Sequence, residues 1–154
     1  MRVHGYGEEC EADGSSTGSE ARNVLLSCNY PWYKTPVFEI AHADNVLEAI
    51  QEFLRDDSIL LCGVSIANDV TKVEYYNIDI SGVIDLQQDI GNPTVNLLPF
   101  LYDLANAYIG TNLSKKNPEI AAIRLKEWAN FPLDFDKIKY AALDACLNFE
   151  IARS

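Results

Sequence analysis

Metal-binding residues other than acids are scarce in this sequence. It has two histidines, His4 and His42, and neither has a histidine or cysteine partner at the spacing of a zinc ligand set, so we exclude a zinc site. The four cysteines form no CxxC pair, and three of them (Cys28, Cys62 and Cys146) lie among apolar residues. We therefore expect reduced thiols and an intracellular protein, cytoplasmic or nuclear.

Positive charge is also in short supply. Lys and Arg number 12 against 23 Asp and Glu, which gives a formal net charge of -11. Affinity for a phosphate backbone comes mainly from basic side chains, so this balance excludes a broad basic surface for nucleic acid. Any contact with nucleic acid must be local, through bound metal cations or a small basic patch.

Long apolar runs and phosphate-binding loops are absent. The stretch "MRVHGYGEECEAD" has no apolar signal-peptide core, and no segment approaches the length of a membrane span. The stretch "GYGEEC" is too short for a dinucleotide-binding fingerprint, and no serine-nucleophile motif occurs. We expect a soluble protein without a membrane partner.

The sequence does have enough apolar residues for one well-packed domain. It is 154 residues long and 48% hydrophobic, which predicts a single domain over residues 1–154. A short strand is expected within 2–7, and the polar, Gly/Ser-rich stretch 10–22 predicts a mobile surface loop. The strand-like runs 23–28 and 36–41 are separated by turn residues and predict a hairpin, so the first half contains three antiparallel strands.

The second half alternates between helical and strand-like patterns. The expected elements are, in order, a helix that follows Asp44 or Asn45 and ends at "RDD", a central strand at 58–66, a short helix headed by Asp69, a strand at 82–86, a helix opened by Pro99 and closed by Gly110, and a long last helix capped by Asp134. The economical packing for this order is a mixed sheet with helices on both faces. In the last helix, three- and four-residue steps predict a buried stripe made of Ile138, Ala141, Ala142, Ala145, Phe149 and Ala152.

Acidic residues occur at the ends of predicted core elements. Glu8 and Glu9 end the first strand, Asp69 follows the central strand, and Asp144 lies on the last helix, one turn after Tyr140. Carboxylates brought together repel one another unless a cation lies among them, so these residues are a candidate divalent-metal site. The alternative is ordinary surface acids, with Asp69 serving as a helix N-terminal charge.

Two of these segments resemble a known family. The closing "LKEWANFPLDFDKIKYAALDACLNFEIAR" is similar to the third motif of DEDDy-type 3′–5′ exonuclease domains, in particular the Werner-syndrome-type exonucleases of plants, with Trp128, Tyr140 and Asp144 in the matching positions. "LLCGVSIANDVTKV" resembles the second motif and gives Asp69 its role, and "PVFEIAHAD" and "FLYDLANAYIG" resemble connecting segments. The resemblance implies an α/β fold of the ribonuclease-H-like type: a mixed sheet with three antiparallel strands and then parallel strands, flanked by helices on both faces.

The first motif of that family departs from the pattern in this chain. The family has Asp-x-Glu at the end of the first strand, and aligning "VHGYGEEC" with it puts Glu9 in the position of the Glu, Gly7 in the position of the Asp, and Cys10 in the position of the following Trp. The resemblance implies that Glu9, Asp69 and Asp144 bind Mg²⁺ or Mn²⁺, and that Tyr140 positions the attacking water. It also implies that the missing ligand at Gly7 is the one that bridges two metals. We therefore expect weak or absent metal binding and impaired catalysis.

Three functions stay open on the sequence alone. The first is an exonuclease-like domain that has lost most catalysis and binds a nucleic-acid 3′ end or a protein partner. The second is an active two-metal 3′–5′ exonuclease that uses neighbouring acids to hydrolyse DNA or RNA ends, and the third is a protein-interaction module on the same fold. Possible contacts to a phosphate backbone are four basic residues before the last helix: Lys115, Lys116, Arg124 and Lys126.

Overall fold

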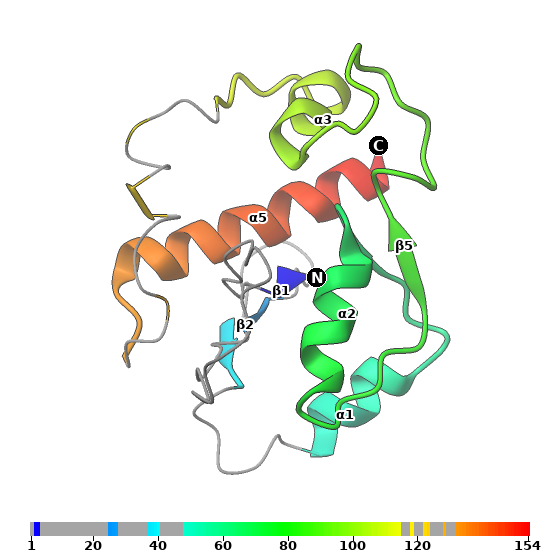
Figure 1. Ribbon diagram of the computed structural model, residues 1–154, viewed down its shortest axis with the longest axis vertical. Helices are drawn as coiled ribbons and strands as arrows, with labels where there is room; N and C mark the ends of the chain where they lie inside the picture. Colours follow the sequence, from blue (N-terminus) through cyan, green and yellow to red (C-terminus); the bar gives the residue numbers. More distant parts are fainter. Residues whose placement is uncertain are drawn as a thin grey trace, which may run out of the picture.

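The computed structural model describes residues 2–3, 25–27, 37–40, 48–114, 118, 122–123, 128 and 132–154 (Figure 1). Three short strands come first, followed by helices alternating with two further strands and then a long last helix, which is the predicted order. The elements are β1 (Arg2–Val3), β2 (Leu25–Ser27), β3 (Val37–Glu39), α1 (Glu48–Arg55), β4 (Leu61–Gly63), α2 (Ile66–Glu74), β5 (Val83–Asp85), α3 (Leu101–Tyr108) and α5 (Phe135–Arg153). The chain is therefore a mixed α/β protein.

The strands form two sheets within the described residues. β1, β2 and β3 pair antiparallel in chain order, with Val3 opposite Leu26 and Leu26 opposite Phe38. β4 and β5 pair parallel, with Cys62 opposite Ile84, and α2 forms the crossover between them. Because no described strand pair joins the two sheets, the single mixed sheet of the ribonuclease-H-like type remains a prediction.

Helices cover both faces of the parallel pair. Successive side chains of a strand point to opposite faces, and in β4 this sends Leu61 and Cys62 to different clusters. Leu61 belongs to a cluster with residues of α1 and α2, including Leu54 and Val73. Cys62 packs against a second cluster formed with residues of α3 and α5. Figure 1 shows this arrangement, with α3 on one side of α5 and the α1–α2 pair on the other.

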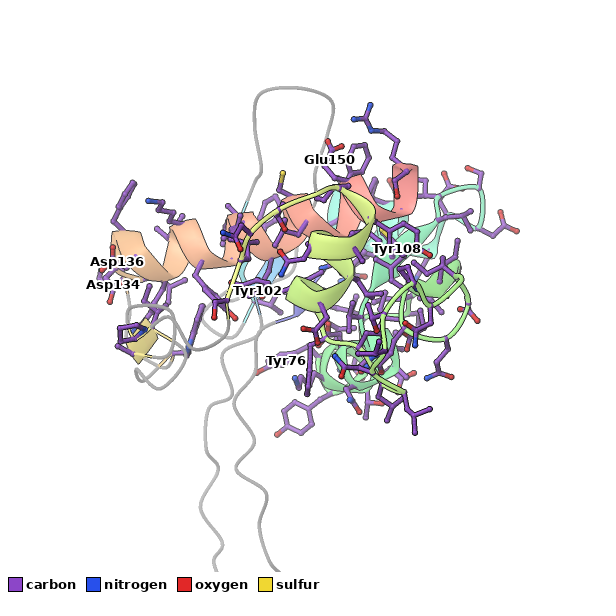
Figure 2. The ribbon with its side chains drawn as sticks, turned by 90° about the horizontal axis from the view of Figure 1, so that it is seen from above. Tyr76, Tyr102, Tyr108, Asp134, Asp136 and Glu150 are labelled. Atoms are coloured by element: carbon purple, nitrogen blue, oxygen red, sulfur yellow. The ribbon has the colours of Figure 1, made fainter. Side chains whose placement is uncertain are left out.

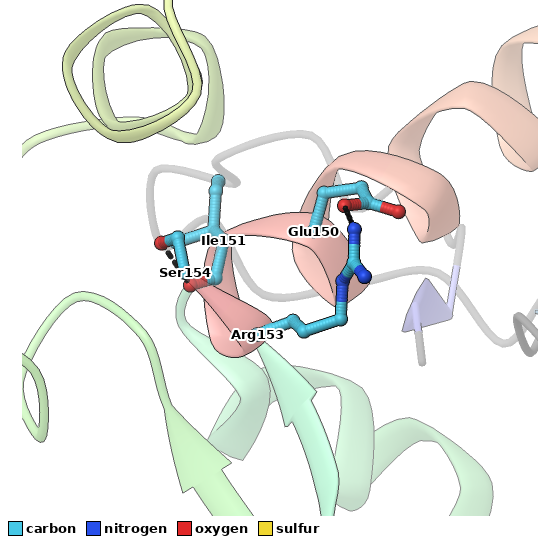
Figure 3. A network of polar contacts seen from close by, with 4 residues as sticks. All are labelled: Glu150, Ile151, Arg153 and Ser154. Atoms are coloured by element: carbon cyan, nitrogen blue, oxygen red, sulfur yellow. Dashed lines mark hydrogen bonds and ion pairs between the residues drawn. The ribbon is translucent and has the colours of Figure 1, made fainter.

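The last helix α5 contacts more of the fold than any other described helix. It packs against α3, against β4 and against all three strands of the antiparallel sheet. Asp134 caps its start, because the Asp134 side chain accepts a hydrogen bond from Lys137 N at 2.9 Å, as predicted. At its end, Arg153 pairs with Glu150 at 2.6 Å and the Ser154 hydroxyl donates to the Ile151 carbonyl (Figure 3).

The predicted strand at 58–66 is too long at both ends. β4 begins only at Leu61, because a turn closed by hydrogen bonds from Ser58 and Ile59 to Asp56 occupies the preceding residues. It ends at Gly63, because Ser65 adopts a left-handed backbone conformation (φ 56°, ψ 42°) and α2 starts at the next residue. The continuous apolar run therefore covers a turn, a strand and the start of a helix.

Two further predictions about α3 have different outcomes. Pro99 is not the first helical residue: it lies one position before the N-cap Phe100, whose amide N–H donates to the Asp103 carboxylate at 3.0 Å. Gly110 does close the helix, with φ at +68°. Thr111 N donates to the Ala105 carbonyl across this glycine, at 3.5 Å.

Cys62 and Cys146 form no disulfide, and both are partly buried. Cys28 lies outside the described residues. None of the helices in the described ranges combines the length and the hydropathy that crossing a bilayer requires.

Candidate active site

Asp69 lies in the first turn of α2, on the face that packs against the protein. The buried residues of this helix are Ile66, Asp69 and Val73, at spacings of three and four, so the helical period that buries two apolar side chains also buries the carboxylate. Asp69 is only 6% exposed. Its Oδ1 lies 3.6 Å from Lys72 Nζ, one turn along, and the positive end of the helix dipole adds to the favourable field.

Asp144 lies in the middle of α5 and is 1% exposed. The predicted stripe on this helix is right for Ala141 and Ala145, which are buried, and wrong for Ile138 and Ala152, which are exposed. Buried positions also follow steps of four and three through Lys137, Ala141, Asp144, Asn148 and Ile151. Hydrophobic periodicity missed part of this face because Lys137, Asp144 and Asn148 are polar. Figure 2 shows the same helix from above, with Asp134 and Asp136 at its start and Glu150 near its end.

Tyr140 precedes Asp144 by one turn and packs on Trp128. The two rings meet edge to face, with centroids 6.0 Å apart and planes inclined by 64°. Trp128 is 5% exposed, and it forms a small cluster with Leu133 and Ala141. This contact restricts the orientation of the tyrosine ring. The three residues taken from the third motif thus lie on or against one helix.

β1 packs against both helices that carry the candidate acids. It contacts α2, which carries Asp69, and α5, which carries Asp144. The segment after β1 contains Gly7 and Glu9, and both lie outside the described residues. So do the four predicted phosphate contacts Lys115, Lys116, Arg124 and Lys126.

The donor chemistry of the described acids suits a divalent cation only in part. Mg²⁺ and Mn²⁺ prefer carboxylate oxygens, and Asp69 and Asp144 supply two buried carboxylates from separate helices. Across the described ranges, however, no group of three or more acidic, histidine or cysteine side chains is placed to hold a metal ion. The metal site predicted from the sequence therefore stays a prediction, because Glu9, its third ligand, lies outside the described residues.

Two polar residues near these acids had no place in the sequence reasoning. Asp85 ends β5 and is 9% exposed, and Asn148 is fully buried one turn after Asp144. Asp85 accepts hydrogen bonds from Ser65 N and Gln87 N, at 3.1 and 2.8 Å. The Asn148 side chain accepts from Val64 N at 3.2 Å and donates to the Asp144 carbonyl at 2.8 Å. The available signal was an amide in a helix position flanked by apolar residues, which implies a buried hydrogen-bond partner.

Comparison with known proteins gives one family. A family model described as 3′-5′ exonuclease matches residues 10–154. No curated protein matches the chain.

Among solved structures, the chain is similar to the EXD2 exonuclease domain soaked in Mn. The identity is 22%, the match covers 97% of this chain and 73% of that one, and the TM-score is 0.38. The same domain soaked in Mn and GMP is 20% identical, with 88% and 70% of the two chains covered and a TM-score of 0.39. Likenesses at this distance carry no argument about the site.

Proposed function

The chain belongs to the 3′-5′ exonuclease family, and from this premise we propose that it is a 3′–5′ exonuclease-like domain with impaired catalysis. Its remaining activity is the binding of a nucleic-acid 3′ end or of a protein partner. The observation that supports this proposal is the glycine at position 7, where the DEDDy resemblance requires an aspartate.

Charge is the physical reason that Gly7 matters. In two-metal hydrolysis the cations stabilise both the attacking and the leaving oxygen, and they lie about 4 Å apart. Holding two dications at that distance requires several carboxylates. The resemblance implies that the aspartate expected in place of Gly7 would bind both metals. Glycine supplies no ligand. We expect the loss to raise the barrier by about 4 kcal/mol or more, roughly a thousandfold in rate.

The retained residues keep the remaining parts of such a site. Glu9, Asp69 and Asp144 would hold a divalent cation, which when bound would supply charge stabilisation at a phosphodiester. The contact with Trp128 restricts the ring of Tyr140, so that its hydroxyl can orient a water or a phosphate oxygen. Burial of Asp69 and Asp144 strengthens their attraction for a cation, because water screens it less there.

A protein partner is favoured over nucleic acid by the formal charge of -11, which repels a phosphate backbone. A nucleic-acid 3′ end is favoured by the retained acids, since together they could hold a cation against a phosphate. Fluorescence anisotropy with a labelled single strand, measured with and without Mn²⁺, separates these two partners. Binding that requires Mn²⁺ supports the nucleic-acid end, and absence of binding in both conditions supports the protein partner.

The decisive experiment is a nuclease assay with the natural chain and a Gly7→Asp variant. A strand labelled so that loss of single nucleotides from its 3′ end is visible is incubated in Mg²⁺ and, separately, in Mn²⁺. We expect Gly7→Asp to degrade it at least a hundredfold faster than the natural chain. Asp69→Asn and Asp144→Asn, made in the Gly7→Asp chain, should each abolish this gain, whereas Asp57→Asn, an exposed acid in the turn before β4, should leave it intact.

Two results would contradict the proposal in different ways. Rapid Mg²⁺-dependent cleavage by the natural chain, abolished by Asp69→Asn, would show an active exonuclease in which neighbouring acids replace the missing aspartate. Cleavage that Asp144→Asn leaves unchanged would show that the site is elsewhere.

A further inference from the structure

We propose that Asn148 and Asp85 are positioning residues, which fix the Val64–Ser65 turn and thereby set the place of Asp69 relative to Asp144. This inference rests on the proposed function, because it concerns the same pair of carboxylates. Neither residue is a ligand or a catalytic group in it. Their role is to hold the short piece of backbone from which the Asp69 helix starts.

The turn between β4 and α2 is too short to compensate for a change in its backbone conformation. β4 ends at Gly63 and α2 begins at Ile66, so two residues reverse the chain. Ser65 adopts a left-handed conformation, which a residue with a side chain adopts only when its surroundings impose it. Asp69 lies four residues after Ser65, within the first turn of the helix. Any change in the backbone at Ser65 therefore changes the direction of α2 and moves Asp69 with it.

Asp85 holds this turn from β5. Its Oδ1 accepts from Ser65 N at 3.1 Å, and the same oxygen accepts from Gln87 N at 2.8 Å. The Ser65 hydroxyl donates to Gln87 Oε1 at 2.9 Å, and Gln87 Nε2 donates to the Pro99 carbonyl at 2.8 Å. Ser65 is thus held through both its backbone and its side chain, and the second link extends to the segment that leads into α3.

Asn148 holds the turn from the opposite side. The C=O and the N–H of one peptide unit point in opposite directions. Here the Gly63 carbonyl points toward β5, where it accepts a hydrogen bond from Leu86 N. Val64 N points away from β5, and Asn148 Oδ1 accepts its hydrogen bond at 3.2 Å. The Asn148 amide group then donates to the Asp144 carbonyl at 2.8 Å. The fully buried Asn148 side chain therefore links the Asp144 backbone to the Val64–Ser65 turn, after which the helix with Asp69 begins.

Amide hydrogen exchange, resolved by residue in the full chain, tests the first half of this proposal. In Asn148→Leu, which keeps the branched shape of the side chain and removes both hydrogen bonds, we expect protection of the amides from Val64 to Asp69 to fall at least tenfold more than protection in α3. Asp85→Ala should give the same local pattern from the other side, should Asn148→Leu fail to fold. The matched control is Leu104→Ala, a fully buried position of α3, which should lower protection across the chain by a similar factor everywhere.

Manganese affinity tests the second half, since a merely structural role would leave it unchanged. Mn²⁺ binding is measured by electron paramagnetic resonance in the Gly7→Asp chain, at a temperature where every variant is folded. We expect Asn148→Leu to weaken Mn²⁺ binding about tenfold and Leu104→Ala to leave it unchanged. Asp85→Asn, which keeps the oxygen acceptor, should retain most of the affinity that Asp85→Ala loses.

The outcomes separate this proposal from the proposed function. A uniform loss of protection in Asn148→Leu, or a local loss with unchanged Mn²⁺ affinity, overturns the positioning role while the exonuclease-like site stands. If the Gly7→Asp chain binds no Mn²⁺, the proposed function fails, and the exchange pattern alone then decides whether these two residues fix the start of α2.

Discussion

Two turns of this protein use the same local hydrogen bond in different surroundings. Asp56 accepts a hydrogen bond from Ser58 N at 2.9 Å, and Asp85 accepts one from Gln87 N at 2.8 Å, so each carboxylate closes a turn over its second neighbour. The Asp56 turn is exposed, and its carboxylate bonds only within the turn among the contacts seen. The Asp85 carboxylate is buried and also accepts a hydrogen bond from Ser65 N, in the turn that follows the neighbouring strand β4.

The difference shows how a local turn becomes part of a longer hydrogen-bond network. Both turns read alike in the sequence, as an aspartate followed two residues later by a polar residue. Only the parallel pairing of β4 with β5 brings Ser65 within reach of Asp85. A turn at the surface needs nothing beyond its own residues, whereas the turn beside Asp69 is fixed by three separate elements: β5, α5 and the segment before α3.

The largest expected effect is at Asp85. Asp85→Ala removes the acceptor for both Ser65 N and Gln87 N, and we expect a loss of about 2 kcal/mol in the free energy of unfolding, because partly buried donors are left unpaired. Urea unfolding followed by circular dichroism measures it. Asp85→Asn is the control and should lose no more than about half as much, since its oxygen still accepts. Equal losses in the two variants would mean that the charge, and not the acceptor geometry, holds the turn.

A smaller effect is expected at Ser65, where the left-handed conformation can be separated from the hydrogen bond. Ser65→Ala and Ser65→Gly both lose the bond to Gln87, but only glycine adopts φ near 56° without strain. We expect Ser65→Gly to be more stable than Ser65→Ala by about 1 kcal/mol in urea unfolding. Equal stability of the two variants would contradict the contrast with the Asp56 turn. It would mean that the backbone of Ser65 is not strained and needs no hydrogen bonds from distant residues to hold it.

The smallest effect is expected at the exposed turn, and it depends on pH. Hydrogen bonds from the Ser58 hydroxyl and then from the Ser58 amide hold the pKa of Asp56 below its ordinary value of 3.8. A carboxyl whose pKa is lower in the folded chain stabilises that chain at pH values above the unfolded pKa, and the contribution disappears as the pH falls through the folded pKa. Ser58→Ala should therefore lower the melting temperature slightly at pH 7 and by less at pH 2. An equal difference at both pH values would assign it to the backbone of the turn instead.

Much of the element order was predictable because local rules determine it. Asp134 as a cap, Gly110 as a helix end and the strand around Ile84 are each marked by residues adjacent to the feature itself. The end of β4 was not predictable, because Ser65 is held in its conformation by bonds to residues 20 and more positions away. A continuous apolar run gives no sign of where such a turn occurs.

The residues of the candidate site were likewise only partly predictable from the sequence. The motif resemblance identified Asp69 and Asp144, and both are buried on helices that contact β1. The buried face of α5 was predicted only in part, because apolar spacing does not count Lys137 and Asn148, which lie on the buried side with Asp144. Asn148 and Asp85 were missed because their hydrogen-bond partners, Val64 N and Ser65 N, are distant in the sequence.

The position of α5 in the chain also determines when this domain can fold. Every other described element precedes α5, yet α5 contributes Leu147 and Ile151 to the cluster around α3, and Ala141 to the cluster around Trp128. During synthesis, therefore, both clusters lack the side chains of α5 until this helix has emerged from the ribosome. The helix that carries Asp144 closes both, so neither core is filled until this helix has been made.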